Sequence, residues 1–144
     1  AAEHPAAGVE ELPEWEDGTV AVLSTGGGAP HAIPVSTAVR AGPRRVLIAL
    51  AATRESLARL RREPRCALTI VTGPDVACTA NARAEVLDEV VDGVLAVALD
   101  VDAIEDHMQP RFAIEAGVAW RWTDDEARER DVVVRAALSE LARR

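Results

Sequence analysis

Apolar and polar positions alternate through much of the chain in the way that is typical of β-strands. Residues 19–24 (TVAVLS) and 66–71 (CALTIV) are short runs rich in β-branched and apolar side chains, and each predicts a strand. Residues 35–39 (VSTAV) alternate with period two and predict a half-buried strand. The continuous apolar run 46–50 (VLIAL) predicts a strand that is buried on both faces.

The second half of the chain continues this pattern. Residues 76–87 carry small apolar side chains at every second position, which predicts a strand that a neighbour approaches closely. Residues 90–104 fit either a strand or a buried helix, and we favour a strand because valine is frequent and aspartates alternate outward. Residues 112–122 (FAIEAGVAWRW) predict a last strand with a bulge at Gly117.

Helical spacing appears in three places. Residues 9–15 predict a short helix near the N-terminus. After the third strand, Thr53 is placed to cap a helix in which Leu57 and Leu60 share one face and which Pro64 ends.

A longer helix is predicted at the C-terminal end of the sequence, over residues 124–142. Thr123 is its expected N-cap, and Glu126 completes a capping box three residues later. Its expected apolar face consists of Val133, Ala137, Leu138 and Leu141.

Together these elements predict one domain over residues 1–144, with residues 1–8 as a mobile tail. Strands follow one another through short turns for most of the length, which favours an antiparallel β-barrel with peripheral helices over a parallel sheet. The fold class is therefore mainly β, with an α+β character.

Charge is distributed unevenly along the chain. Residues 40–65 contain eight arginines and two acids, whereas the whole chain has a net charge of −8. A basic stretch beside a helix N-terminus suggests a bound anion. The acidic total and the scarcity of aromatic residues argue against nucleic acid as a partner.

The cysteines, the histidines and the hydropathy of the chain limit its cellular compartment and its chemistry. Cys66 and Cys78 do not make a disulfide framework, no apolar run reaches the length of a membrane span, and residues 1–8 lack a signal-peptide pattern. We therefore expect a cytoplasmic protein with reduced cysteines and no membrane partner. The three histidines have no metal-ligand spacing, so no metal site is expected.

Three motifs in this order resemble the split-barrel flavin-binding proteins related to pyridoxamine 5′-phosphate oxidase. The first is Gly28-x-Pro30-x-x-x-Pro34-Val35, which follows a strand ending in LST. The second is LRREPR at residues 60–65, and the third is GVAWRWT at residues 117–123. The resemblance runs from about Leu12 to Trp122.

The resemblance implies a six-stranded split β-barrel that forms a homodimer with a flavin, FMN, at each of two interface sites. It implies that the second strand presents its backbone to the flavin ring and that the end of the third strand lies along the cofactor. The residues at these positions are Pro34, Val35, Ser36, Thr37, Ala49, Leu50 and Ala51.

The resemblance also implies that the loop and helix start after the third strand hold the cofactor phosphate. Members of the family often have Ser-x-Lys there, whereas this chain has Arg54 and Ser56, so that the cation and the hydroxyl exchange order. Thr53 and Arg59 complete the predicted phosphate site. Arginine suits this role because its planar guanidinium can hold a phosphate in a bidentate manner. The alternative is an N-capped surface helix with solvated arginines.

Trp120 and Trp122 fall on one face of the last predicted strand, where they fit core or dimer packing. The alternative is a wall of the flavin site that is supplied across the dimer.

The leading prediction is an FMN-dependent oxidoreductase that acts on an unidentified small molecule. No catalytic residue is assigned, because the cofactor would carry the chemistry. The alternatives are a reductase that uses a deazaflavin coenzyme, a non-enzymatic flavin- or haem-binding dimer, and a structural dimer without a cofactor. Pyridoxamine phosphate oxidation itself is not expected, since that enzyme's substrate-phosphate residues have no counterparts here.

Overall fold

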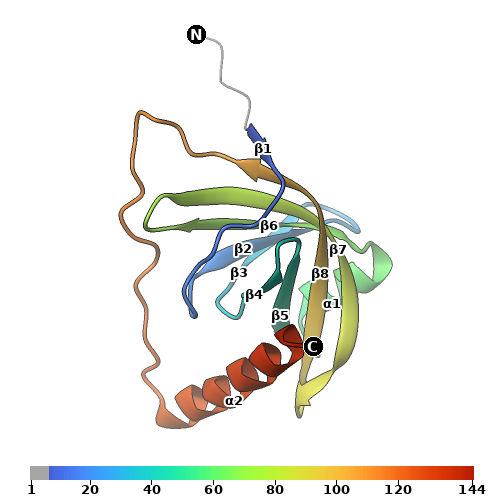
Figure 1. The fold of residues 1–144 in the computed structure, drawn as a ribbon. Helices are drawn as coiled ribbons and strands as arrows, with labels where there is room; N and C mark the ends of the chain where they lie inside the picture. Colours follow the sequence, from blue (N-terminus) through green and yellow to red (C-terminus); the bar gives the residue numbers. More distant parts are fainter. Residues whose placement is uncertain (1–6) are drawn as a thin grey trace.

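A computed structural model describes residues 7–144 and shows one antiparallel sheet with two helices packed against it (Figure 1). The strands are β1 (Ala7–Val9), β2 (Ala21–Thr25), β3 (His31–Val35), β4 (Val39–Gly42), β5 (Arg45–Ala51), β6 (Arg65–Thr72), β7 (Val76–Val91) and β8 (Val94–Asp106). The helices are α1 (Glu55–Arg62) and α2 (Asp125–Ala142).

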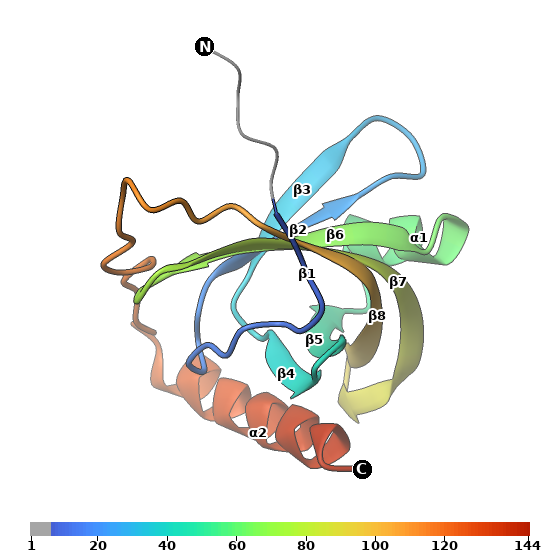
Figure 2. The same ribbon diagram turned by 45° about the horizontal axis from the view of Figure 1, so that its top comes forward.

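The order of the strands explains where the barrel is open. It runs β3-β2-β6-β7-β8-β5-β4, with β1 paired to the end of β8. The two edge strands, β3 and β4, are consecutive in the sequence and are joined by residues 36–38 alone. The sheet must therefore curl until its two edges nearly meet, and the remaining gap is the split of the barrel (Figure 2).

The core lies inside this curled sheet. Leu23, Ile48, Leu68 and Ile70 are completely buried there, as their alternating positions require. Helix α1 adds Leu57 and Leu60 to the same core, as their spacing predicts.

A second apolar cluster lies outside the barrel, beneath α2. Val134 and Leu138 pack there against Leu47, Ala96 and Ala98 of β5 and β8. Leu138 confirms part of the predicted apolar face, but Val133 is 54% exposed, so the face is rotated towards Val134.

Residues 90–104 are β-structure, as the alternation of valine and aspartate indicates. The β7–β8 hairpin turns at Asp92-Gly93, so that residues 90 and 91 end one strand and Val94 begins the next. Gly93 has a φ of +81°, a conformation that favours glycine at this tight turn.

The prediction of one continuous strand over residues 35–39 is wrong. The chain leaves the ladder after Val35 and re-enters a different edge at Val39. Ala38 is buried although the predicted alternation directs it outward, which shows that the chain turns here. With β1 added, the sheet contains eight strands and not six.

The strand predicted over residues 112–122 is also wrong. Residues 107–124 form an extended connecting arm without helix or strand, and most of its side chains are exposed (Figure 1). The arm crosses the β6–β7 turn. There the Ile114 N–H donates to the Asp75 side chain, and the Ile114 carbonyl oxygen accepts from the Asp75 N–H. Alternation within a segment does not show whether another strand pairs with it.

The predicted N-terminal helix and both predicted caps need correction. Residues 9–15 are not helical, because the Leu12 N–H bonds to the Pro43 carbonyl and the Trp15 indole donates to Ala38. The mobile tail predicted for residues 1–8 overlaps β1, and residues 1–6 lie outside the described part. The N-cap of α2 is Asp124, whose side chain accepts from the N–H of Ala127, and not Thr123.

Candidate functional site

A cavity of 330 Å³ opens at the split of the barrel. It is lined by Pro34, Val35, Ser36, Thr37, Ala49, Leu50, Ala51, Arg54, Val94, Trp122, Ala127, Arg130, Asp131 and Val134. All seven residues predicted to lie along a flavin, 34–37 and 49–51, are in this set. The cavity therefore forms where the β3–β4 connection passes the end of β5.

Thr37 joins the two sides of the split. Its hydroxyl oxygen accepts from the Ala49 N–H at 3.0 Å and lies 3.3 Å from the Ala49 carbonyl oxygen, to which it can donate. These contacts continue the ladder where β4 no longer covers β5. A half-buried threonine thus fixes the width of the cavity at this point.

Arg54 lies where β5 gives way to α1. It is the N-cap residue of α1, and its side chain makes no capping bond, so the predicted Thr53 cap is wrong. The Arg54 side chain is exposed at the cavity. A cation beside the free N–H groups of a helix start favours an anion.

Thr53, Ser56 and Arg59 do not line this cavity. Ser56 is 1% exposed, and its hydroxyl lies 3.5 Å from Nδ1 of His31. Arg59 donates to the carbonyl oxygens of Gly26 and Ala29, and it pairs with Glu55. Of the four predicted phosphate contacts, only Arg54 is at the cavity.

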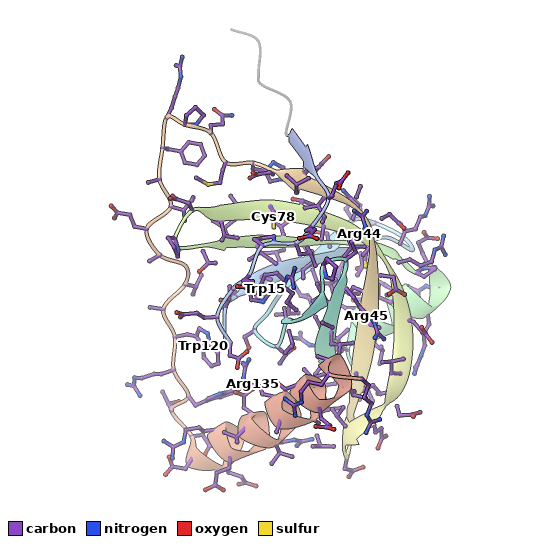
Figure 3. The ribbon with its side chains drawn as sticks, viewed as in Figure 1. Trp15, Arg44, Arg45, Cys78, Trp120 and Arg135 are labelled. Carbon is purple, nitrogen blue, oxygen red and sulfur yellow. The ribbon has the colours of Figure 1, made fainter. Side chains whose placement is uncertain are left out.

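The basic stretch is mostly occupied by structural contacts. Arg40 donates to the Leu12 carbonyl, Arg44 to Val101 and Glu10, and Arg62 to Gly27. Arg45 and Arg65 pair with acids. Separate structural contacts therefore occupy these arginines, and the stretch is not one anion site; Arg44 and Arg45 are labelled in Figure 3.

Part of the cavity lining was not predicted. Helix α2 contributes Ala127, Arg130, Asp131 and Val134, and β8 contributes Val94. The i, i+4 spacing of Asp131 and Arg135 is a sequence signal for an intrahelical ion pair, but it does not show which surface the helix covers.

The two predicted tryptophans lie together although they are not on a strand. Their ring centroids are 5.4 Å apart and the rings are nearly perpendicular. The Trp120 indole donates to the Gly18 carbonyl at 2.8 Å, which holds the arm, and Trp122 reaches the cavity. In this chain Trp122 lines the cavity of its own barrel.

Arg135 connects the three segments that close the cavity. It pairs with Asp131 at 2.7 Å, donates to the Ser36 hydroxyl at 3.4 Å and lies 6.0 Å from the centroid of the Trp120 ring (Figure 3). Its Nη1 atom is buried without a hydrogen-bond partner in the described structure. This guanidinium joins α2, the arm and the β3–β4 connection.

The two cysteines, His31 and His107 do not line this cavity. Burial raises the pKa of Cys66 to about 12 and that of Cys78 to about 11, and the nearby Asp106 carboxylate contributes to the second shift. Both thiols are free, and they pack against the core from adjacent strands, as predicted. Residues 7–144 contain no cluster of metal-ligating side chains.

Solved structures resemble this chain in fold, with low sequence identity. No protein-family model and no curated protein sequence matches it. A candidate pyridoxamine 5′-phosphate oxidase from Lactobacillus delbrueckii has a TM-score of 0.57 and 18% identity, with 70% of this chain and 98% of that chain covered.

Two further solved structures with this fold belong to proteins of other names. The HupZ protein of Group A Streptococcus has a TM-score of 0.54 and 12% identity, with coverage of 70% and 90%. A NimC/NimA family protein from Clostridium acetobutylicum has a TM-score of 0.51 and 13% identity, with coverage of 63% and 81%.

These similarities and the open antiparallel sheet define the class of the protein, which is an α+β split β-barrel. More particularly, the chain has the split-barrel fold found in pyridoxamine 5′-phosphate oxidase-like proteins, as the sequence motifs predict. None of the helices in residues 7–144 is long and apolar enough to cross a membrane.

Proposed function

We propose that the cavity at the split binds FMN and that the protein is a flavin-dependent oxidoreductase acting on a small molecule. The observation that carries this proposal is the coincidence of the cavity with residues 34–37, 49–51 and Arg54. The family resemblance implies a flavin beside the same residues.

The chemistry of the lining fits such a cofactor. Val35, Leu50, Val94 and Val134 give the cavity an apolar interior, which suits a planar ring system. Arg54 supplies a cation for a phosphate, and the only acid in the lining, Asp131, is neutralised by Arg135. The site therefore favours an apolar ligand with an anionic group.

A bound flavin would supply hydride transfer. The protein residues would hold and shield it: the β3–β4 connection and the end of β5 would orient the ring, and Arg54 would hold the phosphate. Trp122 and Val134 would exclude water from the side that α2 covers.

A deazaflavin coenzyme with an acidic tail is the second candidate. The observation in its favour is the second arginine in the lining, Arg130. Haem is a weaker candidate, because the described lining offers no histidine, cysteine, methionine or tyrosine as an axial ligand.

The proposed active form is a homodimer with its cofactor sites at the interface. Part of the outer face of β3, β2, β6 and β7 supports this proposal, because its cross-strand neighbours are uncharged as far as the Arg65–Arg83 pair at one end. They are Ala32, Pro34, Val22, Ser24, Ala67, Thr69, Thr79 and Asn81, with Val71 beside them. Val22 and Val71 are 40% and 46% exposed in a chain that is 28% charged.

Pro34 belongs both to this uncharged face and to the cavity lining. A second subunit on the face would therefore lie beside the opening of the cavity.

The test is a fluorescence titration of purified protein with FMN, followed by addition of NADH or NADPH. Saturation at one flavin per chain and reduction of the bound flavin would support the oxidoreductase. Binding without reduction by any donor would favour the non-enzymatic carrier. Absence of binding would contradict the FMN proposal and direct the same titration to a deazaflavin.

A further inference from the structure

We propose that α2 supplies half of an anion clamp, in which Arg130 and Arg54 together hold the anionic group of the ligand. The inference rests on the proposed flavin-binding function and adds a recognition residue from outside the barrel. Arg130 lies five residues after the first residue of α2, and it lines the cavity together with Arg54.

The two arginines approach the cavity beside the same turn. The Arg130 Nη2 atom donates to the Asp92 carbonyl oxygen at 2.7 Å, and Asp92 begins the β7–β8 turn. On the other side, the Ala52 N–H donates to the Gly93 carbonyl oxygen at 2.8 Å. Because Ala52 is two residues before Arg54, this turn connects the backbone that carries Arg54 to the side chain of Arg130.

The balance of charge in the cavity lining favours an anion. The cavity lining contains two arginines and one acid. That acid, Asp131, has its Oδ2 atom 2.7 Å from Nε of Arg135, and both side chains are at least 84% buried. Two guanidinium groups thus face one cavity while the neighbouring carboxylate is already neutralised.

Arg130 is held in position by the packing of α2. Val134 and Leu138 are buried one and two turns further along the helix. The bond to Asp92 uses one N–H of the Arg130 guanidinium, which has five N–H donors in a planar fork. The remaining donors are free for bidentate contact with a phosphate oxygen pair.

This arrangement predicts the chemical class of the ligand. A planar apolar ring with a phosphate monoester or diester fits the cavity better than the same ring without phosphate. Both FMN and a deazaflavin with a phosphodiester-linked acidic tail belong to this class, and riboflavin does not.

The experiment compares the affinities of FMN and riboflavin in wild type, Arg130→Gln and Arg128→Gln. Arg128 is the matched control, since it lies on the same helix, pairs with Asp125 and does not line the cavity. We expect Arg130→Gln to weaken FMN by about tenfold or more, as is typical when a charge-assisted hydrogen bond is lost. Riboflavin affinity should change by less than about twofold, because it offers no anion to the clamp.

The outcomes separate the clamp from the proposed function. If wild type binds neither FMN nor a deazaflavin, the proposed flavin function fails, and the clamp fails with it. If wild type binds FMN and Arg130→Gln matches Arg128→Gln, the clamp alone is wrong. An equal loss of FMN and riboflavin would also overturn the clamp, because Arg130 would then act on the shape of the cavity.

A further variant separates the loss of the positive charge from a failure to fold. Arg130→Lys keeps the charge, and it should retain a preference for FMN over riboflavin that 0.5 M salt reduces. A preference that salt does not change in wild type or in Arg130→Lys would contradict an electrostatic clamp. If wild type favours the deazaflavin, the same comparison is made with and without its acidic tail.

Discussion

The guanidinium Nη2 of Arg135 lies 3.4 Å from the hydroxyl oxygen of Ser36, which is 99 residues earlier in the chain. This contact joins α2 to the three-residue connection between the two edges of the sheet. It therefore links the stability of the C-terminal helix to the geometry of the split. The first prediction tests this link.

Arg135→Ala should lower the free energy of unfolding by about 1–3 kcal/mol, because the largely buried Asp131 carboxylate would be left without its partner. The native contacts of Arg135 stabilise the fold, but burying its Nη1 atom without a hydrogen-bond partner costs part of that free energy. Urea unfolding followed by tryptophan fluorescence measures the effect. Arg143→Ala is the control, since its exposed pair with Glu140 should contribute less than about 1 kcal/mol.

Adjacent valines in α2 provide a matched test of how the helix is seated. Val134 is 6% exposed and Val133 is 54% exposed. Val134→Ala should cost about 1–3 kcal/mol through lost apolar burial and a cavity, whereas Val133→Ala should cost less than about 0.5 kcal/mol. Equal losses of unfolding free energy would contradict the observed rotation of the helix.

Gly73 and the connecting arm approach each other too closely for a side chain. A Cβ atom at Gly73 would collide with the backbone carbonyl of Glu115, whereas a Cβ atom at Gly42 would meet nothing within 4 Å. Gly73→Ala should displace the arm, increase the exposure of Trp120 and Trp122, and weaken FMN binding. Gly42→Ala should leave tryptophan emission and FMN affinity unchanged, and a similar spectrum for both variants would refute the docking of the arm.

The two cysteines should be unreactive in the folded protein. Because burial raises the pKa of Cys66 to about 12 and that of Cys78 to about 11, both remain thiols at pH 8. An aromatic disulfide reagent should therefore label neither until the protein is unfolded in urea. Rapid labelling of the native protein would contradict their burial.

The same thiols predict how stability changes with pH. Their folded pKa values lie above the unfolded value of 9.0, so the unfolded chain loses these protons first. Their contribution to stability is complete below pH 9 and is lost as the pH rises from 9 towards 11 and 12. Cys78→Ala should reduce this alkaline loss, which urea titrations at pH 8 and pH 10 would measure.

The uncharged outer face predicts the effect of a charge on dimer formation. Val71→Asp should convert the proposed dimer to a monomer, because an unpaired carboxylate would be buried in the interface. Sedimentation velocity measures the change. Val133→Asp is the control, since it places the same charge on the exposed side of α2 and should leave the sedimentation coefficient unchanged.

The local pattern of the chain predicts most of the sheet correctly. Periodicity locates β2, β5, β6, β7 and β8 to within a few residues, and Leu57 and Leu60 identify the buried side of α1. These predictions succeed because burial on one face of an element is encoded in the residues of that element.

The errors concern features that depend on distant parts of the chain. Residues 112–122 have the alternation of a strand, but they pair with no strand of the described sheet. The arginines of residues 40–65 resemble an anion site, but several of them donate to carbonyl oxygens of distant residues, such as Leu12 in a loop and Val101 in β8. The sequence shows which side of α2 is apolar, but it does not show which surface that side covers. The contribution of α2 to the cavity therefore cannot be predicted from the sequence.

The cavity lining extends from Pro34 to Val134 and includes residues of β3, the β3–β4 connection, β5, β8, the arm and α2. During synthesis, these parts leave the ribosome at widely separated times, and the site does not exist until α2 has emerged and packed. A ligand of this cavity therefore binds only the fully folded chain. It would stabilise only the finished molecule, in proportion to the logarithm of its concentration above its dissociation constant.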